Sequence, residues 1–196
     1  MIAAILHRNQ GQVLTPELIA GIVLATQQEE RLAAALPPIA LPSGYVPSFP
    51  LRPSDKRLVL DNHPRVAAFV AQQAGCEMTW AGYFGIGLEQ DGELVAGVIL
   101  ESYTGRNANI HVAGLGKHWL NRNFLLTVFD FCFNRLGLQR LTGLVEADNA
   151  AALRFDTHLG FRLEYTMPDG GRHGDCHILV MRREDSRYLP DEVHHG

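Results

Sequence analysis

The run from Val145 to Phe161 constrains the fold of this chain more than any other segment, because it holds the end of a strand, a helix cap, a helix and a helix stop. Its first residues close an apolar, branched segment of the kind found in buried strands. Asp148 or Asn149 can cap the helix that follows by accepting a free backbone N–H. Gly160 stands where a left-handed residue would end that helix. The run therefore predicts one compact strand–helix unit.

A second unit of the same kind precedes it. Residues 109–112 form a short apolar strand, 114–121 a polar loop, and 124–136 a strongly apolar helix that Gly137 ends. Two successive strand–helix units favour neighbouring parallel strands, since the helical crossover returns the chain to the same end of the sheet. The start of the helix then faces the carboxyl end of a strand, where backbone N–H groups and the helix dipole can hold a phosphate.

Composition limits the classes of protein to which the chain can belong. With 196 residues, 46% of them hydrophobic, the chain can bury one good core. Its formal net charge is -4, so it lacks the basic excess that nucleic-acid binding usually requires. Three widely spaced cysteines, an odd number, indicate reduced thiols in the cytoplasm rather than a disulfide scaffold. The apolar start, Met1–Leu6, is too short for a signal peptide or a membrane span, so we expect no membrane association.

Three parts are predicted along the chain. Residues 1–55 hold a helix that begins at Thr15 and runs to about Ala35, followed by a connector with six of the ten prolines. This connector is either an extended segment laid over a surface or a mobile linker. Residues 56–183 are the main folded domain, and residues 184–196 form a polar C-terminal tail.

The main domain adds a second helix and two hairpins to the two strand–helix units. Asp91-Gly92 is a strong tight-turn signal between two predicted strands. The further predicted elements are a doubtful strand at 56–60, a helix at 65–73, strands at 83–89 and 93–101, and an antiparallel pair at 162–167 and 176–182.

Over roughly residues 56–183, the order of elements resembles that of the GNAT-type N-acetyltransferases. Asn149, then Ala152 and Leu159-Gly160-Phe161, are similar to that family's Asn-x-x-Ala helix ending in Gly-Phe, and the segment 136–141 adds to the match. The resemblance implies an α/β (α+β mixed sheet) fold, the GNAT-like acyl-CoA N-acyltransferase fold, with a central mixed β-sheet flanked by helices and an N-terminal helical extension. It also implies an N-acetyltransferase that carries an acetyl group from its co-substrate acetyl-CoA to an amine acceptor.

The same resemblance implies where acetyl-CoA binds. The two parallel strands would splay, the pantetheine arm would lie between them like a missing strand, and the loop after the first strand would wrap the pyrophosphate. The residues implied to contact the cofactor are Ile110, Val112, Gly114, Gly116, Lys117, His118, Trp119, Leu120, Asn121, Arg122, Asn149 and Phe155.

The chain departs from the family pattern at two places. The phosphate loop lacks the family's two spaced glycines and carries the bulky Trp119. Lys117 and Arg122 either hold the phosphates through their charge or are solvated cations beside a buried indole.

Asp156 stands where many members have a tyrosine that protonates the departing thiolate. A carboxylate is a poor proton donor at neutral pH unless burial raises its pKa strongly. Either the thiolate leaves through water, or Asp156 faces solvent, and we expect the second.

Direct attack of an amine on a thioester needs a base for the amine proton and donors for the oxyanion, and no covalent intermediate. Three side chains on predicted strands or at their ends are candidate catalytic bases: Glu101, His111 and Glu146. Histidine is a common general base in enzymes, but a strand histidine such as His111 also fits a packing role, and the glutamates also fit solvated strand ends. We expect no metal site, because strand alternation sends Cys176 and His177 to opposite faces.

The alternative to an enzyme is a catalytically inactive GNAT-fold module with a structural or binding role. The altered loop and the missing tyrosine favour this reading, and the N-terminal extension would then dock on a protein partner or on a second subunit. An open gap between the two parallel strands favours the enzyme, whereas a gap filled by Trp119 favours the module.

Overall fold

The structure is a computed structural model that describes residues 44–74, 80, 82–116 and 119–189. The predicted N-terminal helix, Cys76, Lys117, His118 and residues 190–196 lie outside the described residues. Within the described ranges, no helix combines the length and the hydropathy needed to cross a membrane.

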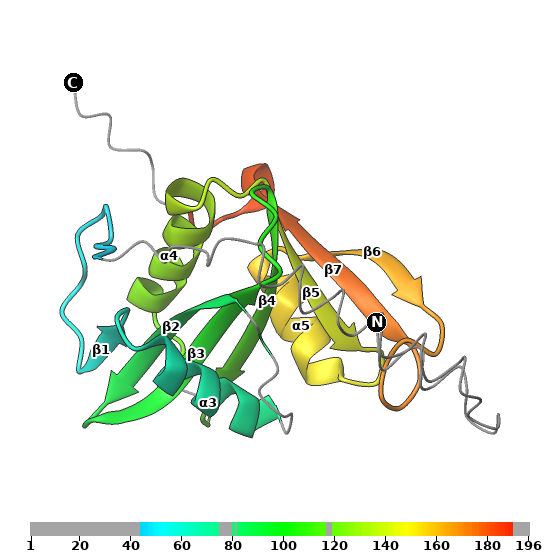
Figure 1. Cartoon of the computed structure of the whole chain (residues 1–196), viewed down its shortest axis with the longest axis horizontal. Helices are drawn as coiled ribbons and strands as arrows, with labels where there is room; N and C mark the ends of the chain where they lie inside the picture. The colour runs from blue at the N-terminus through cyan, green and yellow to red at the C-terminus, as the bar shows by residue number, and fades with distance from the viewer. Residues whose placement is uncertain (1–43, 75–79, 81, 117–118, 190–196) are drawn as a thin grey trace, which may run out of the picture. The chain divides into compact units, whose positions relative to one another are not determined.

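A seven-stranded mixed sheet forms the centre of the domain, with helices packed against it (Figure 1). The strands are β1 (Lys56–Val59), β2 (Tyr83–Gln90), β3 (Glu93–Glu101), β4 (Asn107–Gly114), β5 (Arg140–Glu146), β6 (Arg162–Met167) and β7 (Cys176–Arg182). They lie in the order β1-β2-β3-β4-β5-β7-β6, and only β4 and β5 pair in parallel. The mixed sheet predicted from the sequence is confirmed, including the doubtful first strand and both hairpins.

Helix α3 (His63–Ala74) packs closely on one face of β2 and β3, against strand positions that are glycines. Asn62 caps the helix by accepting the backbone N–H three residues on, at 3.2 Å. A Cβ atom at Gly97 would lie 2.8 Å from Cγ2 of Val70, and one at Gly87 would lie 2.9 Å from Cγ2 of Val66. Without those Cβ atoms, the helix can approach the sheet and bury one apolar cluster. Its buried members are Val59, Val66, Ala67, Val70, Leu94 and Ile99.

Helix α4 (Arg122–Asp130) and the turn after it lie on the opposite face of the sheet. Phe84 of β2, whose side chain points away from α3, packs against Phe131 with ring centroids 5.4 Å apart. The helix predicted at 124–136 is confirmed as helical, but its last part is a π-helical turn, η1 (Phe131–Arg135), that continues α4. In such a turn the backbone N–H bonds five residues back, a detail that apolar periodicity does not indicate.

The described part of the proline-rich connector lies over α4. The buried carboxylate of Asp130 accepts the hydroxyl groups of Tyr45, at 2.5 Å, and Ser48, at 2.8 Å. The side chain of Asn123 bonds the backbone N–H and the carbonyl oxygen of Arg52, at 3.0 and 2.8 Å. Of the two readings that the sequence allows, a segment laid over a surface describes this part of the connector.

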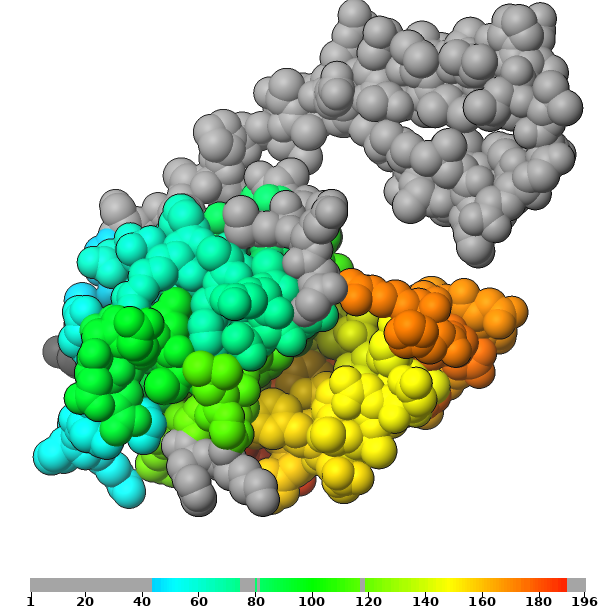
Figure 2. Space-filling view, turned by 90° about the horizontal axis from the view of Figure 1, so that it is seen from below, coloured from blue at the N-terminus to red at the C-terminus, as the bar shows by residue number. Residues whose placement is uncertain are grey.

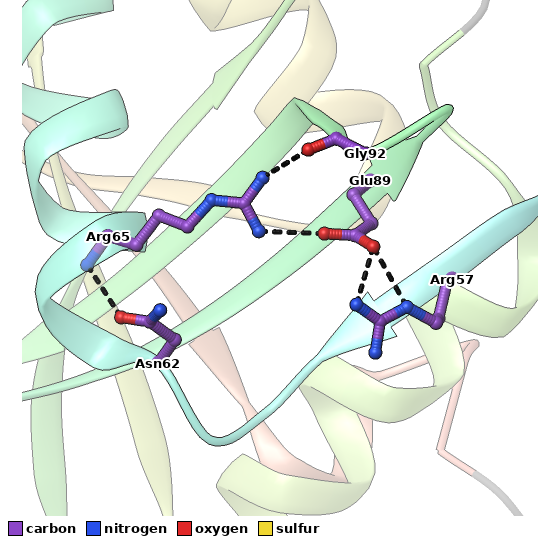
Figure 3. A network of polar contacts seen from close by, with 5 residues as sticks. All are labelled: Arg57, Asn62, Arg65, Glu89 and Gly92. Atoms are coloured by element: carbon purple, nitrogen blue, oxygen red, sulfur yellow. Dashed lines mark hydrogen bonds and ion pairs between the residues drawn. The ribbon is translucent and has the colours of Figure 1, made fainter.

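A buried carboxylate joins β1, α3 and β2 (Figure 3). Glu89 accepts Nη2 of Arg57 at 2.5 Å and Nη1 of Arg65 at 2.7 Å. Nη2 of Arg65 also donates to the carbonyl oxygen of Gly92 at 2.6 Å. The hydrogen bonds from Arg65 and Arg57 lower the pKa of Glu89. They attach the short edge strand and α3 to the turn of the β2–β3 hairpin.

Helix α5 (Ala150–Leu159) has both of the ends predicted from the sequence. Oδ1 of Asn149 accepts the backbone N–H of Ala152 at 3.0 Å, and Gly160, with a φ of +114°, ends the helix. The N–H groups of Gly160 and Phe161 both donate to the carbonyl oxygen of Asp156, at 3.1 and 3.0 Å. This Schellman-type cap fixes the last turn of α5 and with it the backbone of Asp156.

Candidate functional site

Strands β4 and β5 pair at one end only. Their parallel pairing joins Asn107–Asn109 to Arg140–Thr142. Beyond these pairs β4 continues to Gly114 and β5 continues to Glu146 without pairing between them. The V-shaped gap expected between these strands is therefore present, and Gly143 is the first residue of β5 beyond its vertex.

A cavity of about 770 Å³ occupies this gap. In Figure 2 the surface is recessed between the green atoms of β4 and the yellow atoms of α5. Both strands line the cavity, through Ile110, His111, Val112, Ala113, Gly114, Gly143, Leu144, Val145 and Glu146. Residues from the helices and loops also line it, among them Trp119, Leu120, Phe124, Asn149, Phe155, Asp156, Arg172 and His173. A mostly apolar cleft with a few polar groups is typical of a small-molecule site.

Most of the predicted cofactor residues come together around this cavity. Those that line it are Ile110, Val112, Gly114, Trp119, Leu120, Asn149 and Phe155. Gly116, Asn121 and Arg122 do not line it, and Asn121 instead caps α4 by accepting the N–H of Phe124 at 2.8 Å. Lys117 and His118 lie outside the described residues.

The indole of Trp119 borders the open end of the gap without filling it. It packs on Gly114, the last residue of β4, where a Cβ atom would overlap the ring. Its ring centroid lies 5.6 Å from that of Phe155 on α5 and 6.2 Å from that of Phe124 on α4. Trp119 therefore joins the end of β4, the start of α4 and the middle of α5 on one side of the cavity, and the space deeper in the gap stays open.

Glu101 and His111 form a hydrogen-bonded pair on adjacent strands. Oε1 of Glu101 accepts Nε2 of His111 at 3.2 Å and Nδ2 of Asn109 at 3.0 Å, and Oε2 accepts the hydroxyl of Ser102 at 2.5 Å. The bond from His111, with those from Ser102 and Asn109, lowers the pKa of Glu101 to about 2 against the effect of burial. An ionised carboxylate only accepts, so Nε2 of His111 carries the hydrogen and Nδ1 keeps its lone pair when the ring is neutral.

Glu146 lines the cavity from the end of β5, and its carboxylate holds the loop between β6 and β7. Its two oxygens accept the backbone N–H of Arg172 at 2.9 and 3.1 Å, and a Cβ atom at Gly171 would overlap Oε2. Glu101 does not line the cavity, although it bonds His111. Of the three predicted bases, His111 and Glu146 line the cavity. Both oxygens of Glu146 bond the loop, whereas Nδ1 of His111 makes no hydrogen bond among the described residues.

Asp156 does not face solvent, and the expectation from the sequence is wrong on this point. The residue is half-buried and lines the cavity. Its Oδ2 lies 3.9 Å from the position that a Cβ atom would take at Gly143. Burial raises the pKa of the Asp156 carboxyl to about 6. The physical reason is helical spacing: Asp156 follows Ala152 by four residues and precedes Leu159 by three, so all three share the inner face of α5.

Because of this burial, we expect Asp156→Asn to stabilise the protein without ligand at neutral pH. The ordinary carboxyl pKa is about 4, so between about pH 4 and pH 6 the folded state retains a proton that the unfolded state has lost. The free energy of unfolding therefore falls as pH rises through this window and stays lower above it. Because the carboxyl pKa of Asp156 is about two above its ordinary value, Asp156→Asn can raise the free energy of unfolding at neutral pH by at most about 3 kcal/mol. The side chain is partly exposed, so we expect a gain of about 1 kcal/mol.

Urea unfolding of both proteins across this pH range measures the difference. The stability of the two proteins should converge at about pH 4 and diverge toward pH 7. A constant difference at every pH would contradict a buried, titrating Asp156.

No protein-family model matches the sequence, and no curated protein matches it. Solved structures do match. The dodecameric spermidine N-acetyltransferase from Vibrio cholerae has a TM-score of 0.55 at 15% identity, over 67% of this chain and 96% of that chain. YncA from Salmonella typhimurium, solved with its cofactor acetyl-CoA, has a TM-score of 0.53 at 17% identity, over 71% of this chain and 99% of that chain. The chain has the GNAT acetyltransferase fold.

The GNAT fold class predicted from the sequence is thus confirmed, but several residues of the cavity escaped prediction, among them Gly143, Arg172 and His173. The sequence could have indicated Gly143, since a glycine inside a strand is typical of a place where another group approaches the backbone closely. No sequence pattern indicates Arg172 and His173. Their loop lies at the cavity because Glu146 accepts hydrogen bonds from its backbone. The possible metal ligand His177 instead pairs its Nδ1 with the hydroxyl of Thr166 at 2.9 Å.

Proposed function

We propose that the protein is an acetyl-CoA-dependent N-acetyltransferase in which an amine attacks the thioester directly. The observation that carries this proposal is the open cavity between β4 and β5 beyond the last pair, Asn109 with Thr142. Solved proteins of the same fold include N-acetyltransferases, and one of them holds acetyl-CoA. In the alternative, an inactive module, Trp119 would fill this gap, and its position at the edge of the cavity favours the enzyme.

The residues around the cavity fit an elongated cofactor with amides along its length. β4 is paired with β3 on one side, and beyond Asn109 none of the described strands pairs with its other edge, so backbone groups there can bond pantetheine amides. Trp119 supplies an apolar wall at the open end, and Phe155 of α5 packs beside it. The start of α4 provides backbone N–H groups for the pyrophosphate, with Asn121 as its cap. The thioester of acetyl-CoA supplies the activated acetyl group.

We propose that His111 is the base that accepts the proton of the attacking amine. The Nε2–H of His111 is donated to Glu101, which leaves Nδ1 to accept a proton from the attacking amine. Glu101 stays ionised through the physiological pH range, so it fixes this tautomer and stabilises the imidazolium that forms. Glu146 positions the Arg172 loop at the cavity rather than acting as a base.

Calorimetric titration with acetyl-CoA tests the proposal. We expect a Kd on the order of 1–100 μM, in the range of enzyme substrates. Phe155→Ala removes an apolar wall and should weaken binding by about tenfold, whereas Leu153→Ala on the same helix is a matched control outside the cavity. If binding occurs, a screen of amines with detection of the free thiol identifies the acceptor. No heat of binding at millimolar acetyl-CoA would exclude the enzyme and leave the module.

A further inference from the structure

Asp156 occupies the deep end of the cavity rather than its mouth. Its Oδ2 is 3.9 Å from the Cβ position at Gly143, the residue of β5 next to the last pair with β4. The open end of the gap, bordered by Trp119, lies at the other end of β4. An arm that enters past Trp119 and runs along β4 therefore brings its tip, the thioester, to the region of Asp156.

Within the part of the chain that the structure describes, no partner uses the carboxyl of Asp156 for structure. Among the described residues, its side chain makes no hydrogen bond or ion pair, whereas its carbonyl oxygen accepts two N–H groups of the helix cap. The other titratable or charged groups among the described lining residues are His111 on β4, Glu146 on β5, and Arg172 and His173 in the β6–β7 loop. Glu146 is bonded to the backbone of Arg172, and His111 to Glu101.

We propose that Asp156 donates the proton that neutralises the departing coenzyme A thiolate. This inference rests on the proposed acetyl transfer and assigns to Asp156 a step that no other described side chain serves in the proposed reaction. The helix cap at Gly160 and Phe161 holds the Asp156 backbone, so the carboxyl enters the gap from a fixed position.

The step balances in atoms and charge. The amine nitrogen bonds the acetyl carbon and loses a proton to His111, the carbon–sulfur bond breaks, and its electron pair stays on sulfur. That sulfur takes the proton of the Asp156 carboxyl, so amide and free thiol form while His111 and Asp156 end as imidazolium and carboxylate. Exchange of one proton between them, directly or through water, restores both groups. Burial favours the protonated form of Asp156 that this step needs, since it raises the carboxyl pKa to about 6.

Asp156→Asn tests the assignment, because the amide keeps the size of the side chain and cannot donate an acidic proton. We expect kcat for thiol release from acetyl-CoA to fall about 100-fold, with the Kd for acetyl-CoA within about threefold of the original. Thiol release is measured with the amine that the acceptor screen identifies. Asp148→Asn, at an exposed position outside the cavity, is the matched control and should keep full kcat.

Two readouts separate proton donation from a structural role. An aryl thioacetate releases an aryl thiolate, which is stable without a proton. With this acetyl donor, Asp156→Asn should therefore lower kcat much less than it does with acetyl-CoA. The original protein should also lose kcat as pH rises through the pKa of Asp156 in the complex, because the acid must be protonated, and the variant should lack this limb.

The outcomes distinguish this inference from the proposed function. If Asp156→Asn keeps full kcat, or if its kcat falls equally with acetyl-CoA and with the aryl thioacetate, Asp156 is not the proton donor, while the proposed acetyl transfer stands. A protein that never binds acetyl-CoA would overturn the acetyl transfer and the inference together.

Discussion

Gly143→Val should weaken acetyl-CoA binding about 10- to 100-fold while the protein still folds. The nearest atoms to a Cβ atom at Gly143 are Oδ2 of Asp156 and Leu179, each at 3.9 Å, so the first carbon of a side chain fits. The two methyl groups beyond it would project toward Asp156 and enter the space of the cofactor arm. Overpacking of this kind costs about 1–3 kcal/mol, and 1.4 kcal/mol corresponds to a tenfold change in Kd.

A graded series makes this result specific. Gly143→Ala adds only the first carbon and should have a small effect, and Ile178→Val changes a residue of β7 that does not line the cavity. Valine favours strands, so the melting temperature should stay close to that of the original protein. Unchanged affinity in a folded Gly143→Val protein would place the cofactor arm elsewhere in the molecule.

His111→Ala should lower kcat about 100- to 1,000-fold with little change in the Kd for acetyl-CoA. The ring supplies the proton acceptor of the proposed reaction, whereas the cofactor is held by backbone groups and apolar walls. Glu101→Gln keeps a hydrogen-bond acceptor beside Nε2 but removes the charge that stabilises the imidazolium, so its loss should be smaller, about tenfold.

His158→Ala provides the matched control, since His158 is exposed on α5 and does not line the cavity. Steady-state kinetics and calorimetry on the same samples separate catalysis from binding. If His111→Ala and His158→Ala have the same kcat, the amine proton leaves by another route, and Glu146→Gln becomes the next variant to measure.

The elements that the sequence predicted well are those governed by local chemistry. Asn149 and Gly160 bound α5 because a cap needs a short acceptor side chain and a left-handed stop needs glycine. Asp91 and Gly92 both adopt positive φ, as a two-residue hairpin turn requires. Such signals lie within a few residues of one another, so no knowledge of the tertiary structure is needed to interpret them.

The features that escaped prediction depend on contacts between distant segments. The register of β3 against β4 pairs Glu101 with Asn109 and so brings Glu101 to His111, and spacing in the sequence does not give that register. Asp156 shares the inner face of α5, but a polar residue on such a face is easily assigned to solvent. The splay of β4 and β5 leaves a cavity beside α5, and the carboxyl of Asp156 lies at that cavity rather than in solvent.

The positions of the aromatic rings have a practical consequence for every experiment above. The chain contains two tryptophans: Trp119 lines the cavity, and Trp80 packs beside His111, which lines it. Trp119 packs on Gly114 at the open end of the cavity, while the ring of Trp80 lies 5.2 Å from that of His111. Intrinsic fluorescence thus reports the cofactor entrance and the surroundings of the base without a chemical label. Trp80→Phe and Trp119→Phe would divide the emission into one signal for each end of the reaction site.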